Sequence, residues 1–275
     1  MTDLDLDDRT IVLNDAAGFE GMRAAGRLAA QVLDMLAAHV KPGVSTLALD
    51  RLAYDFVVAA GGVSATIFYR GYSHALCTSI NHVICHGIPS HKPLQEGDIV
   101  NIDVTVVLNG WHGDTSRMYF AGEPPLKARR LVDLTYEAMM LGIEQAKPGN
   151  TVGDIGHAIQ KLAEKNRLSV VRDFCGHGLG RRFHMAPNIV HAGRPGEGPE
   201  LKPGMFFTIE PMLNLGRADA RILDDGWTAV TRDRSLSAYL AIRKTLRAHR
   251  FDPASPWMRR GLVWPPPRWV IPTSC

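Results

Sequence analysis

A pattern that occurs twice along the chain constrains the fold more than any other feature. Two segments each contain a long helical pattern, a Lys-Pro-Gly triplet, a hydroxyl residue and a second helical pattern. The triplets begin at residues 41 and 147, and Ser45 or Thr46 in the first segment and Thr151 in the second are suited to cap the following helix. The predicted helices cover residues 16–40, 47–60, 127–146 and 152–166.

The repeat continues into the predicted strands. Asp103 follows a glycine at position 97, and Glu210 follows a glycine at position 204 with the same spacing. A histidine with a proline three residues later also occurs twice, at His86 and His184. The spacing between copies is far longer than in solenoid repeats. The sequence therefore predicts an α+β fold of two pseudo-equivalent halves, each supplying an acid and a histidine to a shared cleft.

A predicted hairpin brings two carboxylates together. Residues 99–108 and 111–120 are rich in strand formers, and the intervening Asn-Gly favours a two-residue turn. That turn places Asp103 and Asp114 as diagonal neighbours on one face, with backbones about 7–8 Å apart. A single aspartate near a turn is usually solvated, but two on one apolar face repel each other unless a cation lies between them. We therefore expect a divalent metal site.

Further metal-binding candidates follow in the second half. His177 and His184 lie in FCGHGLGRRFHMAP, where each alone could instead be a hydrogen-bonded core histidine. Glu210 lies in an apolar run where an unpaired carboxylate is costly, and the proline after it indicates a strand end. Oxygen and nitrogen donors suit Mn, Fe, Co or Zn. The four cysteines lack the spacing of a thiolate site.

Composition excludes several classes of protein. The 275 residues are 45% hydrophobic and 21% charged, and no apolar run is long enough to span a membrane. The acidic N-terminus lacks the features of a secretory signal, and the cysteine usage fits reduced thiols, so we expect a cytoplasmic location. A net charge of +3 is too small to indicate specific nucleic-acid binding.

From about residue 10 to 238 the chain resembles type I methionine aminopeptidase. The similarity lies in CTSINHVICHGIP, GDIVNIDVTVVLNGWHGDTSRMYFAG, GHGLGRRFHMAPNIVH, GMFFTIEPM and DGWTAVTRDRSLSA. The resemblance implies the pita-bread fold, an antiparallel sheet with outer helices and pseudo-two-fold halves. It also implies removal of the initiator methionine from nascent chains whose second residue is small and uncharged. A monomer with two divalent ions (Co, Mn, Fe or Zn) and transient ribosome association is expected on the same basis.

The resemblance also assigns roles to individual residues. Asp103, Asp114, His177 and Glu210 match metal ligands, and His86 and His184 match histidines that contact substrate. The positions that match the walls of the methionine pocket are Tyr69, Tyr72, Cys77, Phe183 and Trp227. Metal-assisted hydrolysis is implied, with Glu210 accepting a proton from the attacking water and His184 and His86 assisting at the scissile amide.

The C-terminal part departs from the family. After Ser237 and Ala238 the family continues Gln-aromatic-Glu-His, and its glutamate bridges two metals; here that position is Ala241. The segment 239–275 is rich in Arg, Pro and Trp, and we interpret it as an aberrant tail after a catalytic domain of residues 1–238. A frameshift is favoured over a diverged but encoded C-terminus. We expect the family's last strand to be lost, a neighbouring strand edge to be unpaired, and only one ion to bind tightly.

Two other functions remain open from the sequence. The first is a catalytically impaired or inactive binding protein on the same fold, favoured by the missing glutamate and distinguished by purified protein without metal. The second is a related dipeptidase acting on Xaa-Pro or creatine-like substrates, which usually carries a large additional N-terminal domain for which this chain lacks room.

Overall fold

The computed structural model describes residues 10–67 and 69–246, and the described part contains the four predicted helices. They are α1 (Ala16–Leu36), α2 (Thr46–Ala59), α3 (Leu126–Gln145) and α4 (Val152–Lys165). The first ends at Leu36 rather than at residue 40, and the other ends lie within one or two residues of those predicted. The predicted hydroxyl cap of α2 is Ser45, whose Oγ accepts a hydrogen bond from the Ala48 N–H at 3.2 Å.

The strands form one large sheet and two small ones. In chain order they are β1 (Val63–Ser64), β2 (Cys77–Ile80), β3 (Val83–Cys85), β4 (Asp98–Leu108), β5 (Trp111–Ala121), β6 (Ser169–Val170), β7 (Gly176–Gly178), β8 (Met185–Ile189), β9 (Phe206–Ile209), β10 (Met212–Asn214), β11 (Ala220–Ile222), β12 (Ala229–Thr231), β13 (Ser237–Tyr239) and β14 (Ile242–Thr245). A short 3₁₀ helix covers Tyr69–Gly71. The large sheet has the order β1-β4-β5-β14-β9-β7-β8, with β2 also paired to β4.

The hairpin β4–β5 has the predicted register. Leu108 lies opposite Trp111, Thr105 opposite Asp114, and Asp103 opposite Ser116. Asn109 and Gly110 have φ angles of 51° and 75°, as a two-residue hairpin turn of type I′ requires. The prediction that Asp103 and Asp114 share one face of the sheet is therefore confirmed.

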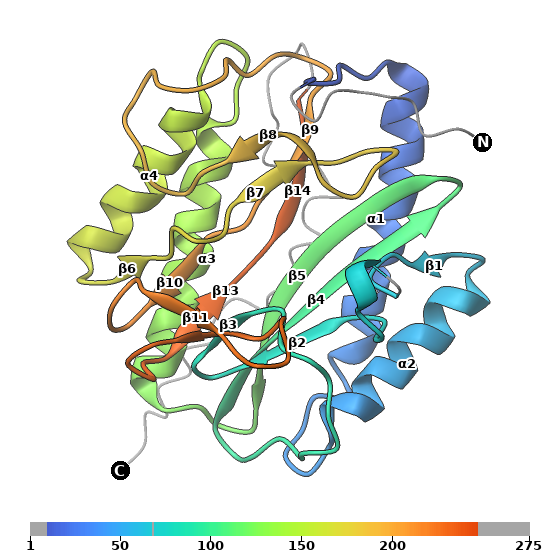
Figure 1. The fold of residues 1–275 in the computed structure, drawn as a ribbon, viewed down its shortest axis with the longest axis vertical. Helices are drawn as coiled ribbons and strands as arrows, with labels where there is room; N and C mark the ends of the chain where they lie inside the picture. The colour runs from blue at the N-terminus through green and yellow to red at the C-terminus, as the bar shows by residue number, and fades with distance from the viewer. Residues whose placement is uncertain (1–9, 68, 247–275) are drawn as a thin grey trace, which may run out of the picture.

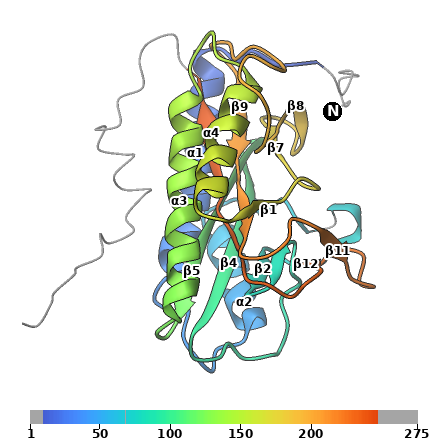
Figure 2. The ribbon, with the colours of Figure 1, turned by 90° about the vertical axis from the view of Figure 1, so that its left-hand side faces the viewer.

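The helices and the small strands lie on opposite faces of the large sheet. Figure 2 shows α1 and α3 along one side of the sheet, with β11 and β12 on the other. Buried side chains of α1 and α2 pack against β4, and those of α3 and α4 pack around β9, so each half has its own apolar cluster. The strands of the first half and of the second half occupy opposite ends of the sheet, which confirms the predicted two-half arrangement (Figure 1).

The expectation that the last strand is lost is wrong. β14 lies between β5 and β9, with Ile242 paired to Thr115 on one side and to Ile209 on the other. Backbone N–H and C=O groups make these pairings, so the strand forms although its side chains differ from the family pattern. β14 therefore covers the edges of β5 and β9 and joins the two halves of the sheet.

The aberrant tail lies mainly outside the described residues, which end at residue 246. The division of the chain at residue 238 stays a prediction, although the sheet itself continues to Thr245. In the described part of the chain, none of the helices combines the length and apolar character needed to cross a membrane.

Candidate active site

The two aspartates of the hairpin face the side of the sheet that the long helices leave open. Asp114 is buried, and Asp103 is partly buried with its Oδ1 atom completely shielded from solvent. Ser116, opposite Asp103, accepts a hydrogen bond from Asn101 Nδ2 at 3.0 Å. The hairpin thus presents the two carboxylates beside short polar side chains, Asn101 and Ser116, that are hydrogen-bonded to each other.

The second half brings His177 to these aspartates. His177 lies in β7, and its Nε2 is 3.4 Å from Asp114 Oδ2 and 3.6 Å from Glu210 Oε1. Its Nδ1 lies 3.0 Å from the carbonyl oxygen of Gly178, which fixes the ring when that nitrogen carries the proton. The imidazole therefore joins an acid of the first half to an acid of the second.

Glu210 follows the end of β9, as its neighbouring proline indicated. The Thr208 hydroxyl donates to Glu210 Oε1, and the Tyr239 hydroxyl lies 3.1 Å from Glu210 Oε2. The backbone N–H of Glu210 donates to His191 Nε2 at 3.1 Å. The buried carboxylate and its backbone are thus held from three directions.

Burial and mutual repulsion dominate the electrostatics of the acids. Burial first, and then the charges of Asp114 and Glu210, raise the pKa of Asp103 well above its ordinary value. Burial also raises the pKa of Glu210, to about 7. For His177, burial lowers the pKa, but the hydrogen bond to Asp114 and the nearby carboxylates outweigh it and raise the pKa to about 9. A buried cluster with this much negative charge is a site that a cation stabilises.

The donor set fits a divalent metal ion. Three carboxylates and one imidazole are hard-to-borderline ligands, and the buried Asp103 Oδ1 has no hydrogen-bond partner. As placed, no three His, Cys, Asp or Glu side chains of the described residues are close enough together to ligate one ion. The two oxygens of Glu210 lie within hydrogen-bond distance of the Thr208 and Tyr239 hydroxyl groups.

The predicted substrate histidine of the second half lies beside this cluster. The rings of His184 and His177 have centroids 4.3 Å apart, and Phe183 stacks on His184 at 4.1 Å. The Tyr69 hydroxyl lies 2.9 Å from His184 Nδ1. Burial, followed by the charge of His177, lowers the pKa of His184 to about 3, so its ring is neutral at neutral pH.

A second aromatic group surrounds His86. Its ring lies 6.2 Å from that of Trp227, which in turn lies 5.0 Å from Tyr72. Asp225 holds the turn that carries Trp227 by accepting the Trp227 N–H at 2.8 Å. His86 has a φ of 56°, a left-handed conformation that is uncommon for a non-glycine residue and frequent at functional sites.

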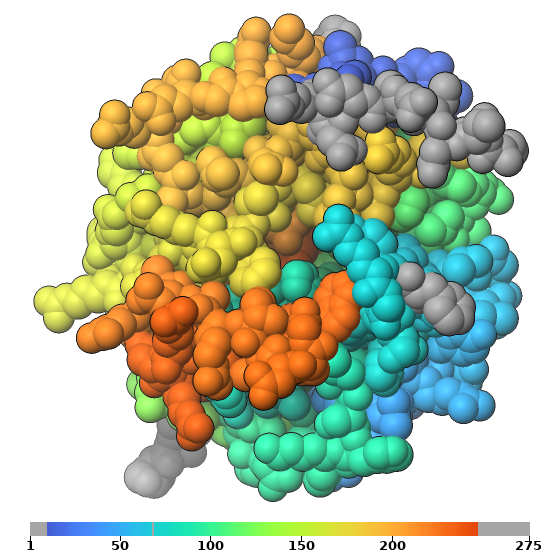
Figure 3. Space-filling view, in the orientation of Figure 1, coloured from blue at the N-terminus to red at the C-terminus, as the bar shows by residue number. Residues whose placement is uncertain are grey.

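The predicted pocket residues thus border the carboxylates from two sides. Cys77 lies directly opposite Asp103 in the pairing of β2 with β4. Figure 3 shows a hollow in this face of the molecule, bordered by the segments around residues 65–75, 175–185 and 220–230. These are the segments that carry the aromatic side chains named above.

Sequence reasoning missed several residues that complete the site. They are Thr208, His191, Tyr239, His112 and Phe174. Strand alternation could have found Thr208, because it lies in β9 two residues before Glu210, which directly follows that strand. His191 and Tyr239 carried no comparable signal, since each reaches Glu210 from a distant part of the chain.

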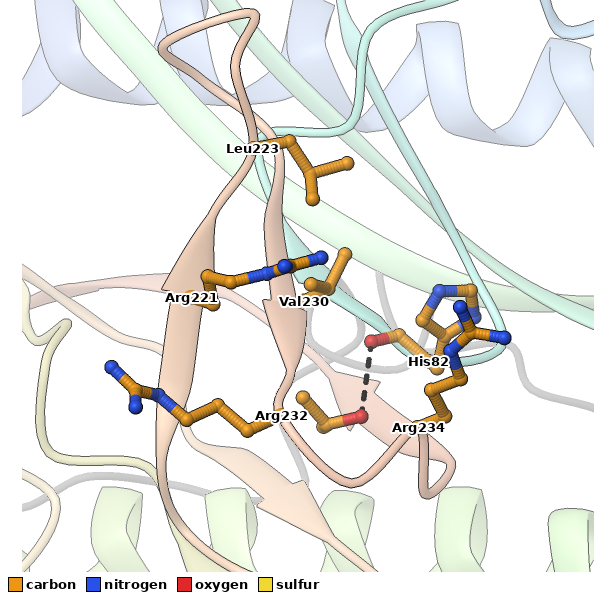
Figure 4. A pocket seen from close by; sticks show the side chains of 7 residues that line it. His82, Arg221, Leu223, Val230, Arg232 and Arg234 are labelled. Atoms are coloured by element: carbon orange, nitrogen blue, oxygen red, sulfur yellow. Dashed lines mark hydrogen bonds between the residues drawn. The ribbon is translucent and has the colours of Figure 1, made fainter.

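A separate cavity of about 500 Å³ lies on the β11–β12 hairpin. Figure 4 shows that its wall is basic, with His82, Arg221, Arg232 and Arg234 around Leu223 and Val230. The Thr231 hydroxyl closes one side by donating to the His82 carbonyl at 3.5 Å. Its lining contains no carboxylate and none of the predicted site residues, so this cavity is separate from the predicted metal ligands.

Buried acids and a histidine at the junction of two related halves define a metal-dependent hydrolase of the pita-bread class. The chain belongs to the metallopeptidase family M24, whose profile matches residues 20–232. The resemblance noted in the sequence is thereby confirmed, and with it the α+β pita-bread fold.

Curated relatives carry a more specific name. A methionine aminopeptidase of Rickettsia prowazekii is 55% identical over 230 residues, covering 83% of this chain and 89% of the relative. The methionine aminopeptidase of Escherichia coli K12 is 52% identical over 221 residues, covering 80% and 84%.

Solved structures agree with these relatives. The crystal structure of methionine aminopeptidase from Rickettsia prowazekii superposes with a TM-score of 0.87 at 52% identity, covering 88% of this chain and 98% of that one. A prolidase from Pyrococcus furiosus shares the fold alone, with a TM-score of 0.69 at 18% identity, and this chain covers 63% of it.

Proposed function

We propose that this protein removes the N-terminal methionine from nascent polypeptides whose second residue is small and uncharged. The observation that carries the proposal is that His177 Nε2 lies 3.4 Å from Asp114 and 3.6 Å from Glu210, with Asp103 on the same face of the hairpin as Asp114. The high identity to proteins named methionine aminopeptidase supports the substrate class.

A divalent ion held by the three carboxylates and His177 would lower the pKa of a water molecule enough to make it a nucleophile at neutral pH. Glu210 would be suited to accept a proton from a water molecule beside it, because burial raises the pKa of its carboxyl group. Thr208 orients the carboxylate by donating a hydrogen bond to Oε1. The ion that we propose for this site is Mn, Fe, Co or Zn in its divalent form.

His184 is suited to donate to the oxyanion that develops during hydrolysis. Its ring is neutral, and it has one N–H to offer. When the Tyr69 hydroxyl donates to Nδ1, the proton of His184 resides on Nε2, the nitrogen not engaged by Tyr69. His86, whose pKa burial also lowers, assists the leaving nitrogen from the side of Trp227.

The predicted pocket residues are suited to a methionine side chain. Tyr69 packs against Phe183 and Tyr72 against Trp227, and a thioether gains from contacts with aromatic rings. The buried carboxylates favour a free α-ammonium group nearby, which restricts cleavage to the first residue. A cytoplasmic monomer that meets nascent chains near the ribosome is the setting we propose, and gel filtration checks the oligomeric state.

Peptide cleavage tests the proposal directly. The full chain, loaded with Mn²⁺ or Co²⁺, is incubated with a Met-Ala peptide and with its N-acetylated form, and free methionine is measured by mass spectrometry. We expect release only from the peptide with a free amine, and loss of release in Glu210→Gln. Release from both peptides would exclude an aminopeptidase, and a purified chain that contains no metal and releases no methionine would favour the binding-protein alternative.

A further inference from the structure

Tyr239 connects acids from the two halves of the site. Its hydroxyl oxygen lies 3.1 Å from Glu210 Oε2 and 3.3 Å from Asp103 Oδ2. Its side chain is 4% exposed, so water does not compete for these contacts. The hydroxyl thus stands between two predicted metal ligands that approach each other from β4 and from the end of β9.

The position of the ring is fixed by its backbone. Tyr239 pairs with Met212 in the small sheet of β13 and β10. Asn101 Nδ2 donates to the Tyr239 carbonyl oxygen at 2.6 Å, and the same amide donates to Ser116 at 3.0 Å. Asn101 shares the face of β4 that carries Asp103, so the strand that presents the carboxylate also anchors the tyrosine.

Ala241 occupies the position where the family resemblance placed a bridging glutamate. Its N–H donates to Ser116 Oγ at 2.7 Å, and its carbonyl accepts from the Ser116 N–H at 2.9 Å. The residue is 2% exposed and packs in the same apolar cluster as Tyr239.

We infer that Tyr239 replaces the missing glutamate as a neutral link between Asp103 and Glu210, so that the site holds one divalent ion tightly rather than two. Without a carboxylate at position 241 the predicted ligands, once deprotonated to bind an ion, are three carboxylates and one neutral imidazole. One dication leaves this set at −1, whereas two would leave +1 in a buried site, where like charges repel strongly. Tyr239 is a positioning residue: it orients Asp103 and Glu210 and carries no charge of its own. The inference deepens the proposed metallopeptidase function and rests on it.

Calorimetric titration of the metal-free full chain with Mn²⁺ tests the inference, with elemental analysis as a second measure of stoichiometry. We expect one ion per chain. Tyr239→Phe keeps the ring and removes the hydroxyl, so it should still bind one ion, with an affinity about 10-fold lower or weaker because outer hydrogen bonds orient the ligands. Tyr119→Phe is the matched control. It also removes a buried tyrosine hydroxyl, which donates to the Leu33 carbonyl at 2.6 Å, and it should bind metal as the parent chain does.

A second pair of variants tests the relation between the two positions. Ala241→Glu alone should bind one ion, because the Tyr239 ring shares its cluster. Tyr239→Gln combined with Ala241→Glu, which restores the family residues, should bind two. Two ions per parent chain would overturn the inference, and this measurement does not depend on any variant being folded. Equal metal affinity in Tyr239→Phe and the parent chain would also overturn it.

The inference and the proposed function fail separately. One ion per chain with weakened binding in Tyr239→Phe, but no methionine release, would support the inference and reject the proposed function. Two ions per chain with efficient methionine release would reject the inference and support the proposed function.

Discussion

At the scale of single residues, the hydrogen bonds of the site divide the acids into two kinds. Glu210 has both oxygens engaged by hydroxyl groups, and Asp114 lies against the His177 ring. Asp103 has one oxygen near Tyr239 and one buried oxygen without a partner. A buried carboxylate oxygen without a hydrogen-bond partner is costly, so a cation bound beside Asp103 would stabilise this carboxylate.

The two aspartates should therefore differ when neutralised. Asp114→Asn should lose most of the bound metal, because Asp114 is the acid beside His177. Asp103→Asn should retain most of the bound metal. The amide oxygen of the asparagine can still accept the hydrogen bond from the Tyr239 hydroxyl, which also contacts Glu210. Elemental analysis of both purified variants measures this, and equal metal content in the two would contradict the assignment.

At the scale of elements, capping and pairing decided which segments formed. Helix boundaries could be predicted because caps and Lys-Pro-Gly triplets act locally. β14 could not be predicted, because its Ile-Arg-Lys-Thr sequence has no strand alternation and its pairing partners, β5 and β9, supply the stabilisation. A contact outside the sheet adds to it: the Arg243 guanidinium donates to the Met22 carbonyl in α1 at 2.6 Å.

The start of α4 provides a prediction on pH. Asp154 Oδ2 accepts from the Thr151 N–H at 2.7 Å and from its hydroxyl at 2.9 Å, and these hydrogen bonds lower the pKa of Asp154. A lowered folded-state pKa contributes stability above the ordinary value, which is lost as the pH falls through the folded value. Asp154→Ala should cost about 0.5–1 kcal/mol at neutral pH, because it removes one member of a capping box, and this difference should shrink as the pH falls below the ordinary aspartate pKa of 3.8.

Urea unfolding of the parent chain and of Asp154→Ala at several pH values measures this difference. Asp154→Asn is the control, because it keeps an acceptor oxygen but cannot titrate, so its own stability should lack this acid dependence. A difference between parent and Asp154→Ala that stays constant across the range would show that the carboxylate charge does not stabilise α4.

At the scale of the whole molecule, the site exists because two halves meet in one sheet. The repeated pattern predicted those halves, and the hairpin register predicted how Asp103 and Asp114 face each other. The links across the junction were beyond sequence reasoning. Tyr239, His191 and Asn101 each reach a partner more than fifteen residues away, and only the folded chain determines such contacts. The position of Ala241 was predicted, but its consequence depends on the tyrosine beside it.

The most direct test of the account compares methionine release from Met-Ala and Met-Lys peptides by the metal-loaded full chain, with and without a chelator. The account predicts release from the Met-Ala peptide, little or none from the Met-Lys peptide, and loss of all release when the metal is removed. Comparable cleavage of both peptides would contradict the proposed specificity, and release that persists in the chelator would contradict a metal-dependent site built on Asp103, Asp114, His177 and Glu210.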